Sequence, residues 1–160
     1  MITKQFLDRH ALSVEFADRL GVCLQIGHEE PAAVAMLGQA THPADVLWLH
    51  LFYHDLHTAL IQARGATAAQ FNRAVYERLK PGGSYVIVDH AAAGRTGTSD
   101  AQSLHRIDPA FVREEVEAAG FVLDAESTML ANKDDPHSIK VFDPSIKGKT
   151  DRFAYRFVKR

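Results

Sequence analysis

The sequence predicts one α/β domain over residues 1–160, with a sheet of about five strands, mostly parallel, and an antiparallel carboxyl-terminal strand. The chain has 160 residues, 46% of them hydrophobic, which suits one core of ordinary size rather than two. Two short apolar runs, Ala44–Phe52 and Ser84–Val88, flank a helical pattern, as in a strand–helix–strand unit. The closing run Arg152–Val158 alternates apolar and basic residues, which is typical of a strand near a sheet edge.

The first part of the chain predicts a helix, a strand and a second helix. Phe6–Leu20 carries apolar residues at roughly helical spacing, so we expect a helix in at least its second half. Val22–Ile26 is short, bulky and bounded by glycines, which favours a strand. Pro31–Leu37 has proline in its first turn and a glycine just past its end, as short helices do.

The middle of the chain predicts the centre of the sheet. Ala44–Phe52 is apolar almost without alternation, which indicates a central strand covered on both faces. Ala66–Leu79 places its apolar residues on one helical face, and the sequence PGG ends that helix abruptly. Ser84–Val88 then predicts a second buried strand.

The last third predicts a loop, a helix and two strands. Ala91–Asp100 is small and glycine-rich, which indicates a loop or lid. A helix opens at Asp108 and runs to Gly120. The segment from Phe121 onward alternates like a strand with one face exposed, and we expect the closing run to pair antiparallel beside it.

Composition excludes several classes of partner. Eighteen basic and twenty acidic residues give a net charge of −2, so nothing points to nucleic acid or to a membrane surface. Cys23 lies in an apolar run and is interpreted as a small buried hydrophobe. The amino-terminal residues are charged where a signal peptide needs an apolar stretch, and no window approaches a membrane span. We therefore expect a cytoplasmic protein.

Polar side chains gather where the predicted strands end. In an open α/β sheet, ligands bind outside the carboxyl ends of the strands, and consecutive strands are usually neighbours. Three clusters fall at that rim: Tyr53, His54, Asp55 and His57; Asp89 and His90; His105, Arg106 and Asp108.

Some of these rim residues have a structural role open to them as well. Asp55 and Asp108 are explained equally well as helix caps. The histidines could ligate a metal ion, but His54 and His57 lack the glutamate of HExxH and match no zinc motif, so we predict no metal site. No GxSxG element supports a serine hydrolase, and no phosphate-binding loop is present in the sequence.

A set of motifs carries a family resemblance. YHDL, LKPGG, VDH, LHRID, AAGF and the closing FDPSIKGKTDRFAYRFVKR together resemble class I S-adenosylmethionine-dependent methyltransferases, in particular a bacterial branch of predicted methyltransferases. The similarity covers about Gly21 to Arg160. It implies a Rossmann-like sheet, S-adenosylmethionine as cofactor in a cleft at the strand carboxyl ends, and a small-molecule substrate in a pocket built by the later loops.

The sequence departs from this family at its amino end. The family binds the methyl donor through a glycine-rich loop after the first strand and an acidic residue ending the second strand. The early glycines Gly21, Gly27 and Gly38 form no GxGxG after a strand, although only glycine lets the backbone approach the donor so closely. The chain thus resembles a truncated methyltransferase.

The resemblance also implies roles for the rim residues. His54 or His90 is the candidate general base, because imidazole titrates near neutral pH, and Arg106 would orient an anionic group. The candidate site consists of catalytic residues and of substrate- or cofactor-binding residues: His54, Asp89 and His90; Tyr53, Asp55, His105 and Arg106. The alternatives are an inactive remnant that serves as a binding or dimerisation module, and a longer native protein whose upstream segment encodes the glycine loop.

Truncation would leave an exposed strand edge. Without the family's first strands, the outer side of the strand Val46–Phe52 would be unpaired, and long apolar edges aggregate unless covered. Direct pairing with Val22–Ile26 would cover it, and so would a second subunit. We therefore expect this strand pair and a homodimer.

Overall fold

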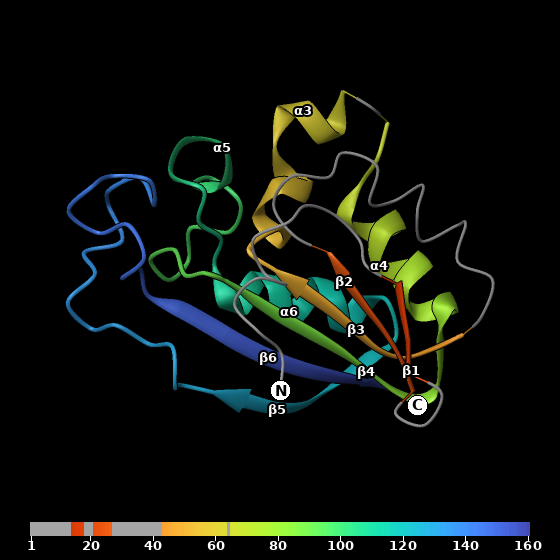
Figure 1. The fold of residues 1–160 in the computed structure, drawn as a ribbon. Coiled ribbons are helices and arrows are strands. Elements are labelled where there is room, and N and C mark those ends of the chain that lie inside the picture. Colours follow the sequence, from red (N-terminus) through yellow and green to blue (C-terminus); the bar gives the residue numbers. More distant parts are fainter. Residues whose placement is uncertain (1–13, 18–20, 27–42, 64) are drawn as a thin grey trace.

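The computed structural model describes residues 14–17, 21–26, 43–63 and 65–160. These residues form one six-stranded sheet in the order β1-β2-β3-β4-β6-β5, one strand more than the sequence predicted (Figure 1). The strands are β1 Val14–Ala17, β2 Gly21–Ile26, β3 Ala44–His50, β4 Leu79–His90, β5 Phe121–Ser127 and β6 Arg152–Lys159.

The strand directions confirm the predicted α/β class. β2, β3 and β4 run parallel to one another, and β6 runs antiparallel to both β4 and β5. The chain thus crosses over between its parallel strands and closes with an antiparallel strand inserted beside β4. This order brings the carboxyl ends of β3 and β4 together with the start of β6 at one rim of the sheet.

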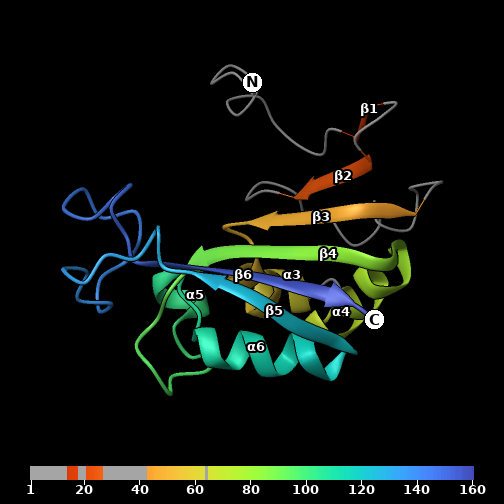
Figure 2. The same ribbon diagram turned by 90° about the horizontal axis from the view of Figure 1, so that it is seen from below.

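The described helices pack against one face of the sheet. They are the 3₁₀ helix η1 Tyr53–His57 and the α-helices α3 Ala59–Gln62, α4 Ala68–Arg78, α5 Ala101–Leu104 and α6 Pro109–Ala118. Helices α4 and α6 contact each other and share one core with the strands (Figure 2). Leu47, Tyr85 and Phe157 form one cross-strand row of that core and are fully buried with Phe71 of α4 and Val112 of α6.

The passage from α4 to β4 contains no loop. Thr67 and Gln70 form a reciprocal capping box at the start of α4, and the helix ends at Arg78. β4 then begins at once and is longer than the predicted strand Ser84–Val88 at both ends. Gly83 allows the close passage, because a Cβ there would lie 2.9 Å from the Lys80 carbonyl oxygen. The longer strand carries Asp89 and His90 as its last two residues.

The predicted helix at the amino end is wrong for the residues described there. Val14–Ala17 is a strand that pairs antiparallel with β2. A four-residue segment has little intrinsic preference of its own, so the available hydrogen-bonding partner decides its conformation. The predicted helix Pro31–Leu37 lies outside the described residues.

The exposed strand edge is covered as predicted by direct pairing. Cys23–Ile26 of β2 pairs in parallel with Val46–Leu49 of β3, which makes β3 an internal strand. The expectation that β3 is covered on both faces is wrong, because Trp48 in its middle is 41% exposed. Side chains of successive strand residues point to opposite faces, and the helices described here cover only the face of Leu47 and Leu49.

Candidate active site at the strand rim

A backbone reversal after β3 builds the first part of the site. Leu51 adopts a left-handed conformation with φ of 53°, which is rare for a residue with a side chain. Its N–H donates to the carbonyl oxygen of Val88 in β4 at 2.8 Å. The chain is thereby turned over the end of the sheet, and η1 begins directly above the last residues of β4. Unusual backbone of this kind is concentrated at functional sites.

His54 of η1 and Asp89 of β4 form a buried pair. The Nδ1 atom of His54 lies 2.8 Å from Oδ1 of Asp89, and neither side chain is exposed. The carboxylate also accepts the backbone N–H of His54 at 2.8 Å and that of His90 at 2.7 Å. Since both backbone groups must donate, Asp89 acts as an acceptor throughout. His54 therefore donates from Nδ1, and in its neutral form the other ring nitrogen, Nε2, carries the lone pair.

The electrostatics of the pair support an ionic interaction. Burial alone would lower the pKa of His54, but the charge and hydrogen bond of Asp89, with a contribution from Asp55, raise it above its usual value. Burial alone would raise the pKa of Asp89, but the charge and hydrogen bond of His54 outweigh it and lower it. Both shifts favour a charged carboxylate that fixes the imidazole.

The opposite edge of the His54 ring points to two further rim residues. Its Nε2 atom lies 3.3 Å from Nδ1 of His105 and 3.4 Å from Oδ1 of Asp55. His105 follows α5 and also has a left-handed backbone, with φ of 56°. The side chains of Asp55 and His105 are 15% and 19% exposed. The structure thus brings three predicted site residues together, with one side open to solvent.

His90 lies beside this group but in a different environment. Its Nδ1 atom is 2.7 Å from the hydroxyl of Thr150, and its ring centroid is 6.0 Å from that of His54. Burial lowers the pKa of His90 to about 4, which keeps the imidazole neutral near neutral pH. His90 is therefore suited to hydrogen bonding rather than to strong proton abstraction.

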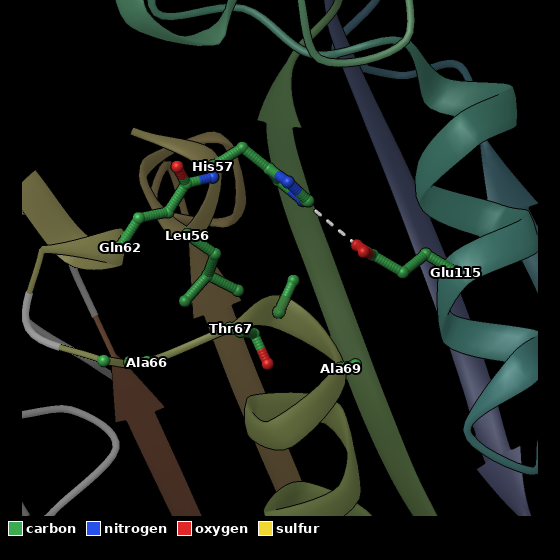
Figure 3. A pocket seen from close by; sticks show the side chains of 9 residues that line it. Leu56, His57, Gln62, Ala66, Thr67, Ala69 and Glu115 are labelled. Atoms are coloured by element: carbon green, nitrogen blue, oxygen red, sulfur yellow. Dashed lines mark hydrogen bonds and ion pairs between the residues drawn. The ribbon is translucent and has the colours of Figure 1, made fainter. Parts of the chain in front are cut away.

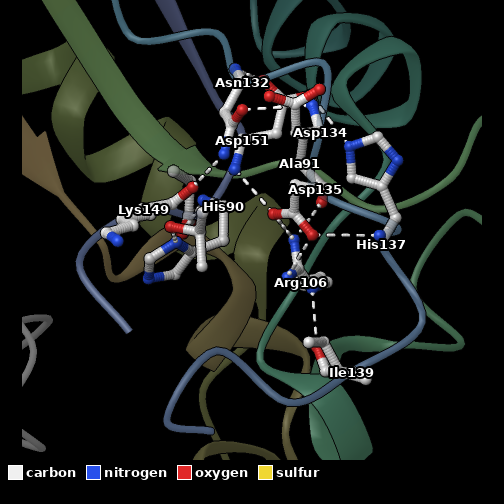
Figure 4. A network of polar contacts seen from close by, with 12 residues as sticks. His90, Ala91, Arg106, Asn132, Asp134, Asp135, His137, Ile139, Lys149 and Asp151 are labelled. Carbon is white, nitrogen blue, oxygen red and sulfur yellow. Dashed lines mark hydrogen bonds and ion pairs between the residues drawn. The ribbon is translucent and has the colours of Figure 1, made fainter. Parts of the chain in front are cut away.

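Arg106, predicted to orient an anionic group, is buried in an internal ion pair. Its guanidinium is fully buried and donates to both carboxylate oxygens of Asp135, at 2.9 and 3.0 Å (Figure 4). It also donates to the carbonyl oxygens of Ala91 and Ile139, at 3.0 and 3.1 Å. The guanidinium has five N–H donors, and four of them are used in these hydrogen bonds. Arg106 therefore links the segments that contain Ala91, Asp135 and Ile139, and this network is called the brace below.

Tyr53 is also internal rather than ligand-facing. Its hydroxyl donates to Oε2 of Glu115 at 2.7 Å and accepts from Nδ2 of Asn72 at 2.7 Å, and the side chain is fully buried. Burial raises the pKa of Tyr53 well above its ordinary value. Tyr53 is thus a positioning residue for η1, and the sequence prediction of direct ligand contact is not supported by this geometry.

Two pockets border the rim. One has a volume of about 420 Å³ and lies between η1, α3, the start of α4 and α6. His57 and Glu115 line it and approach each other to 3.0 Å (Figure 3). The other has a volume of about 560 Å³ and is built by the connection between β5 and β6, including Thr150 and Arg152.

Sequence reasoning missed Asp135, Glu115 and Arg152. Asp135 lies in a polar connection, and Glu115 lies among other helix acids, so neither carries a distinguishing local signal. Arg152 is different, because it opens β6 in register with His90. Among the described residues, its Nε atom is the buried side-chain polar atom without a hydrogen-bond partner. Asp108, by contrast, caps α6 through Ala110, as the helix-cap interpretation predicted.

No family model and no curated protein matches this sequence. Solved structures with a similar fold include the N-methyltransferase NodS from Bradyrhizobium japonicum WM9, with 12% identity, a TM-score of 0.48, and coverage of 75% of this chain and 53% of that one. The CcbJ methyltransferase from Streptomyces caelestis matches with 13% identity, a TM-score of 0.47 and coverage of 76% and 59%. The chain thus spans about half the length of these structures. No helix among the described residues is long and apolar enough to cross a membrane.

Proposed function

We propose that this chain belongs to the methyltransferase type and transfers a methyl group from S-adenosylmethionine to a small-molecule acceptor at the strand rim. The observation that carries the proposal is the buried His54–Asp89 pair, which spans the carboxyl ends of the adjacent parallel strands β3 and β4. Ligands of open α/β sheets bind at such ends. The closing strand order and the motifs of the sequence resemblance support the same assignment.

The described residues offer chemistry that suits the methyl donor. S-adenosylmethionine presents ribose hydroxyls, a cationic sulfonium and an aromatic base. Asp55 provides a partly exposed carboxylate beside His105, and the exposed ring of Phe142 packs 4.9 Å from the His105 ring, measured between centroids.

The pocket built by the β5–β6 connection is the proposed acceptor site. The sequence resemblance implies a substrate pocket made by the later loops, and this pocket is lined by Lys149, Thr150 and Arg152. Thr150 connects it to His90 through the 2.7 Å contact. The Nε atom of Arg152, which has no hydrogen-bond partner among the described residues, favours an acceptor with an anionic group. Arg152 thus takes over the role predicted for Arg106.

The chain's own residues then bind and orient the acceptor. Asp89 holds His54 so that Nε2 faces the rim, where it can hold an acceptor hydroxyl or amine. The neutral His90 and Thr150 provide further hydrogen bonds at the pocket. When bound, S-adenosylmethionine supplies the electrophilic methyl group.

Isothermal titration with S-adenosylmethionine and S-adenosylhomocysteine, in a buffer with a metal chelator, tests the proposal. We expect micromolar binding that Asp89→Asn weakens and that Asp124→Asn, an exposed carboxylate on β5, leaves unchanged. Circular dichroism confirms that each variant is folded. Absence of heat at millimolar ligand from the folded wild-type chain would contradict the proposal.

The second candidate is a binding or dimerisation module without methyl transfer. The exposed Trp48 in the middle of an internal strand favours it, because tryptophan is enriched in protein–protein interfaces. Sedimentation velocity tests the homodimer expected from the sequence. A dimer that Trp48→Glu converts to monomer supports it, and a wild-type monomer at all concentrations excludes it.

A further inference from the structure

We propose that His54, Asp55 and His105 form a binding site for a divalent transition-metal ion of the zinc type. The potential ligand atoms are Nε2 of His54, Oδ1 of Asp55 and Nδ1 of His105, and all three lie within 4.8 Å of one another. The site goes beyond the proposed methyl transfer and does not depend on it, since the ligand atoms come entirely from this chain. With an ion bound, His54 and Asp55 would act as its ligands in place of the roles proposed for them above in the metal-free chain.

The separations of the three atoms match a metal coordination sphere. They form a triangle with sides of 3.3, 3.4 and 3.7 Å. The centre of the circle through these corners lies about 2.0 Å from each atom, which agrees with zinc–nitrogen and zinc–oxygen bonds of about 2.0–2.2 Å. Tetrahedral coordination at these bond lengths places neighbouring ligand atoms about 3.3–3.4 Å apart. Each protein atom therefore needs little movement to bind an ion.

Hydrogen bonding within the triangle accounts for its geometry less well. N–H···O hydrogen bonds are about 2.7–3.2 Å long, and the two sides that end on Asp55 exceed that range. In the neutral form of His54 with its proton on Nδ1 toward Asp89, the His54–Asp55 side joins a nitrogen lone pair to a carboxylate oxygen. Both atoms could then bind the same cation.

The surroundings of His54 are those of a metal ligand. A ligating histidine usually donates its second ring N–H to a carboxylate, which fixes its orientation and increases its basicity. Asp89 provides this carboxylate at 2.8 Å and is itself held by two backbone N–H groups. The supporting shell is therefore complete before any ion binds.

The ligand set and the exposure indicate the class of ion and of site. Two imidazoles with one carboxylate favour zinc and related transition ions over magnesium and calcium, which prefer oxygen ligands. Three protein ligands leave one tetrahedral position, and the partial exposure of Asp55 and His105 opens it to the rim. A small molecule or water could therefore reach the ion.

Sequence spacing argued against a metal because it compared His54 with His57. In the structure the histidine beside Nε2 of His54 is His105, which is 51 residues away in the chain. His57 instead contacts Glu115 at 3.0 Å. His105 directly follows helix α5, and its left-handed backbone places it at the rim. The local sequence motif does not indicate this contact.

The test titrates the chelator-treated wild-type chain with zinc chloride by calorimetry and with cobalt(II) by visible absorption. We expect one equivalent of zinc and the intense visible bands of tetrahedral cobalt. His105→Ala and Asp55→Asn should abolish the bands and weaken zinc binding by about tenfold or more. Both side chains are partly exposed, so these variants should fold.

The matched control is His137→Ala, which removes a histidine that is paired with a carboxylate and lies outside the proposed ligand set. His137 lies 2.9 Å from Asp151 and is 28% exposed. This variant should bind zinc and cobalt like the wild type. If His105→Ala and Asp55→Asn bound zinc as tightly as the wild type, other histidines of the chain would be the ligands. That outcome would overturn the proposal. So would the absence of zinc binding by the wild type, whatever the result of the methyl-donor titration.

Discussion

The rim cluster of His54, Asp55 and His105 and the brace around Arg106 share consecutive residues of the chain, but their polar groups are paired in different ways. His105 and Arg106 are consecutive, yet their side chains enter different networks. The guanidinium of Arg106 makes four contacts of 2.9–3.1 Å and has no exposed surface. The ring of His105 faces the rim at separations of 3.3 and 3.7 Å and remains partly exposed.

This contrast shows how a saturated polar cluster differs from one prepared for a ligand. A buried charge with all its hydrogen bonds made stabilises one arrangement of the chain and has little left to offer a ligand. The rim cluster of His54, Asp55 and His105 instead keeps three potential ligand atoms within 4.8 Å of one another, and two of its side chains are partly exposed. Substitutions in the two regions should therefore have opposite effects on stability and on binding.

The largest effect is expected from Asp135→Asn in the brace. The amide cannot accept both donors of Arg106 as the carboxylate does, which leaves a buried guanidinium without its counterion. Breaking a buried pair on one side costs about 3–5 kcal/mol. Urea unfolding measures the loss, and Asp134→Asn, at a neighbouring exposed residue, is the control. A loss similar to that of the control would contradict the role of the brace.

The same pair predicts a pH dependence of stability. Burial alone would raise the pKa of Asp135, but the N–H of Asp151, the guanidinium of Arg106 and the N–H of His137 lower it below its usual value. A group with a lowered folded pKa stabilises the fold above its unfolded pKa of about 3.9 and loses that contribution as pH falls through the folded value.

The stability difference between wild type and Asp135→Asn should therefore be constant near neutral pH and shrink below about pH 4. Urea unfolding of both proteins over an acidic pH series measures it. A difference that grows on acidification would show that the assigned shift has the wrong direction.

A smaller effect on stability and a clear effect on binding are expected from Asp89→Asn. The carboxylate accepts three donors, and the amide group of asparagine would oppose at least one of them. An unmatched buried donor costs about 1–3 kcal/mol. Zinc affinity should fall by about 10- to 100-fold, because the partner of a metal-ligating histidine is lost. Unchanged zinc affinity in this folded variant would remove Asp89 from the supporting shell.

The smallest effect on stability should accompany the largest effect on binding. His105→Ala removes a partly exposed ring, so we expect a stability change below about 1 kcal/mol, together with loss of the cobalt bands. Thermal unfolding with and without zinc measures the stability change and the binding of zinc together. A large loss of stability without zinc would assign His105 to the same structural class as Arg106.

Sequence reasoning located the rim but not the contacts within it. The predicted strands place the ends of β3 and β4 side by side, and His54 and Asp89 indeed meet there. Arg106 and Tyr53, both predicted to contact a ligand, are buried against protein partners, and residue type and position alone do not show whether a side chain has such a partner. Asp135 and Glu115 provide those partners from 29 and 62 residues away.

The α/β class, the order of the main elements from Ala44 onward and the rim where polar residues gather can all be predicted from the amino-acid sequence. These features depend on local periodicity, on glycine and proline signals, and on the rule that parallel strands end together. Three features became visible in the folded chain alone: Val14–Ala17 is a strand, Arg106 is buried against Asp135, and His105 lies beside His54 and Asp55. Each depends on a partner distant in the chain, and no local pattern encodes the three-dimensional contact that selects it.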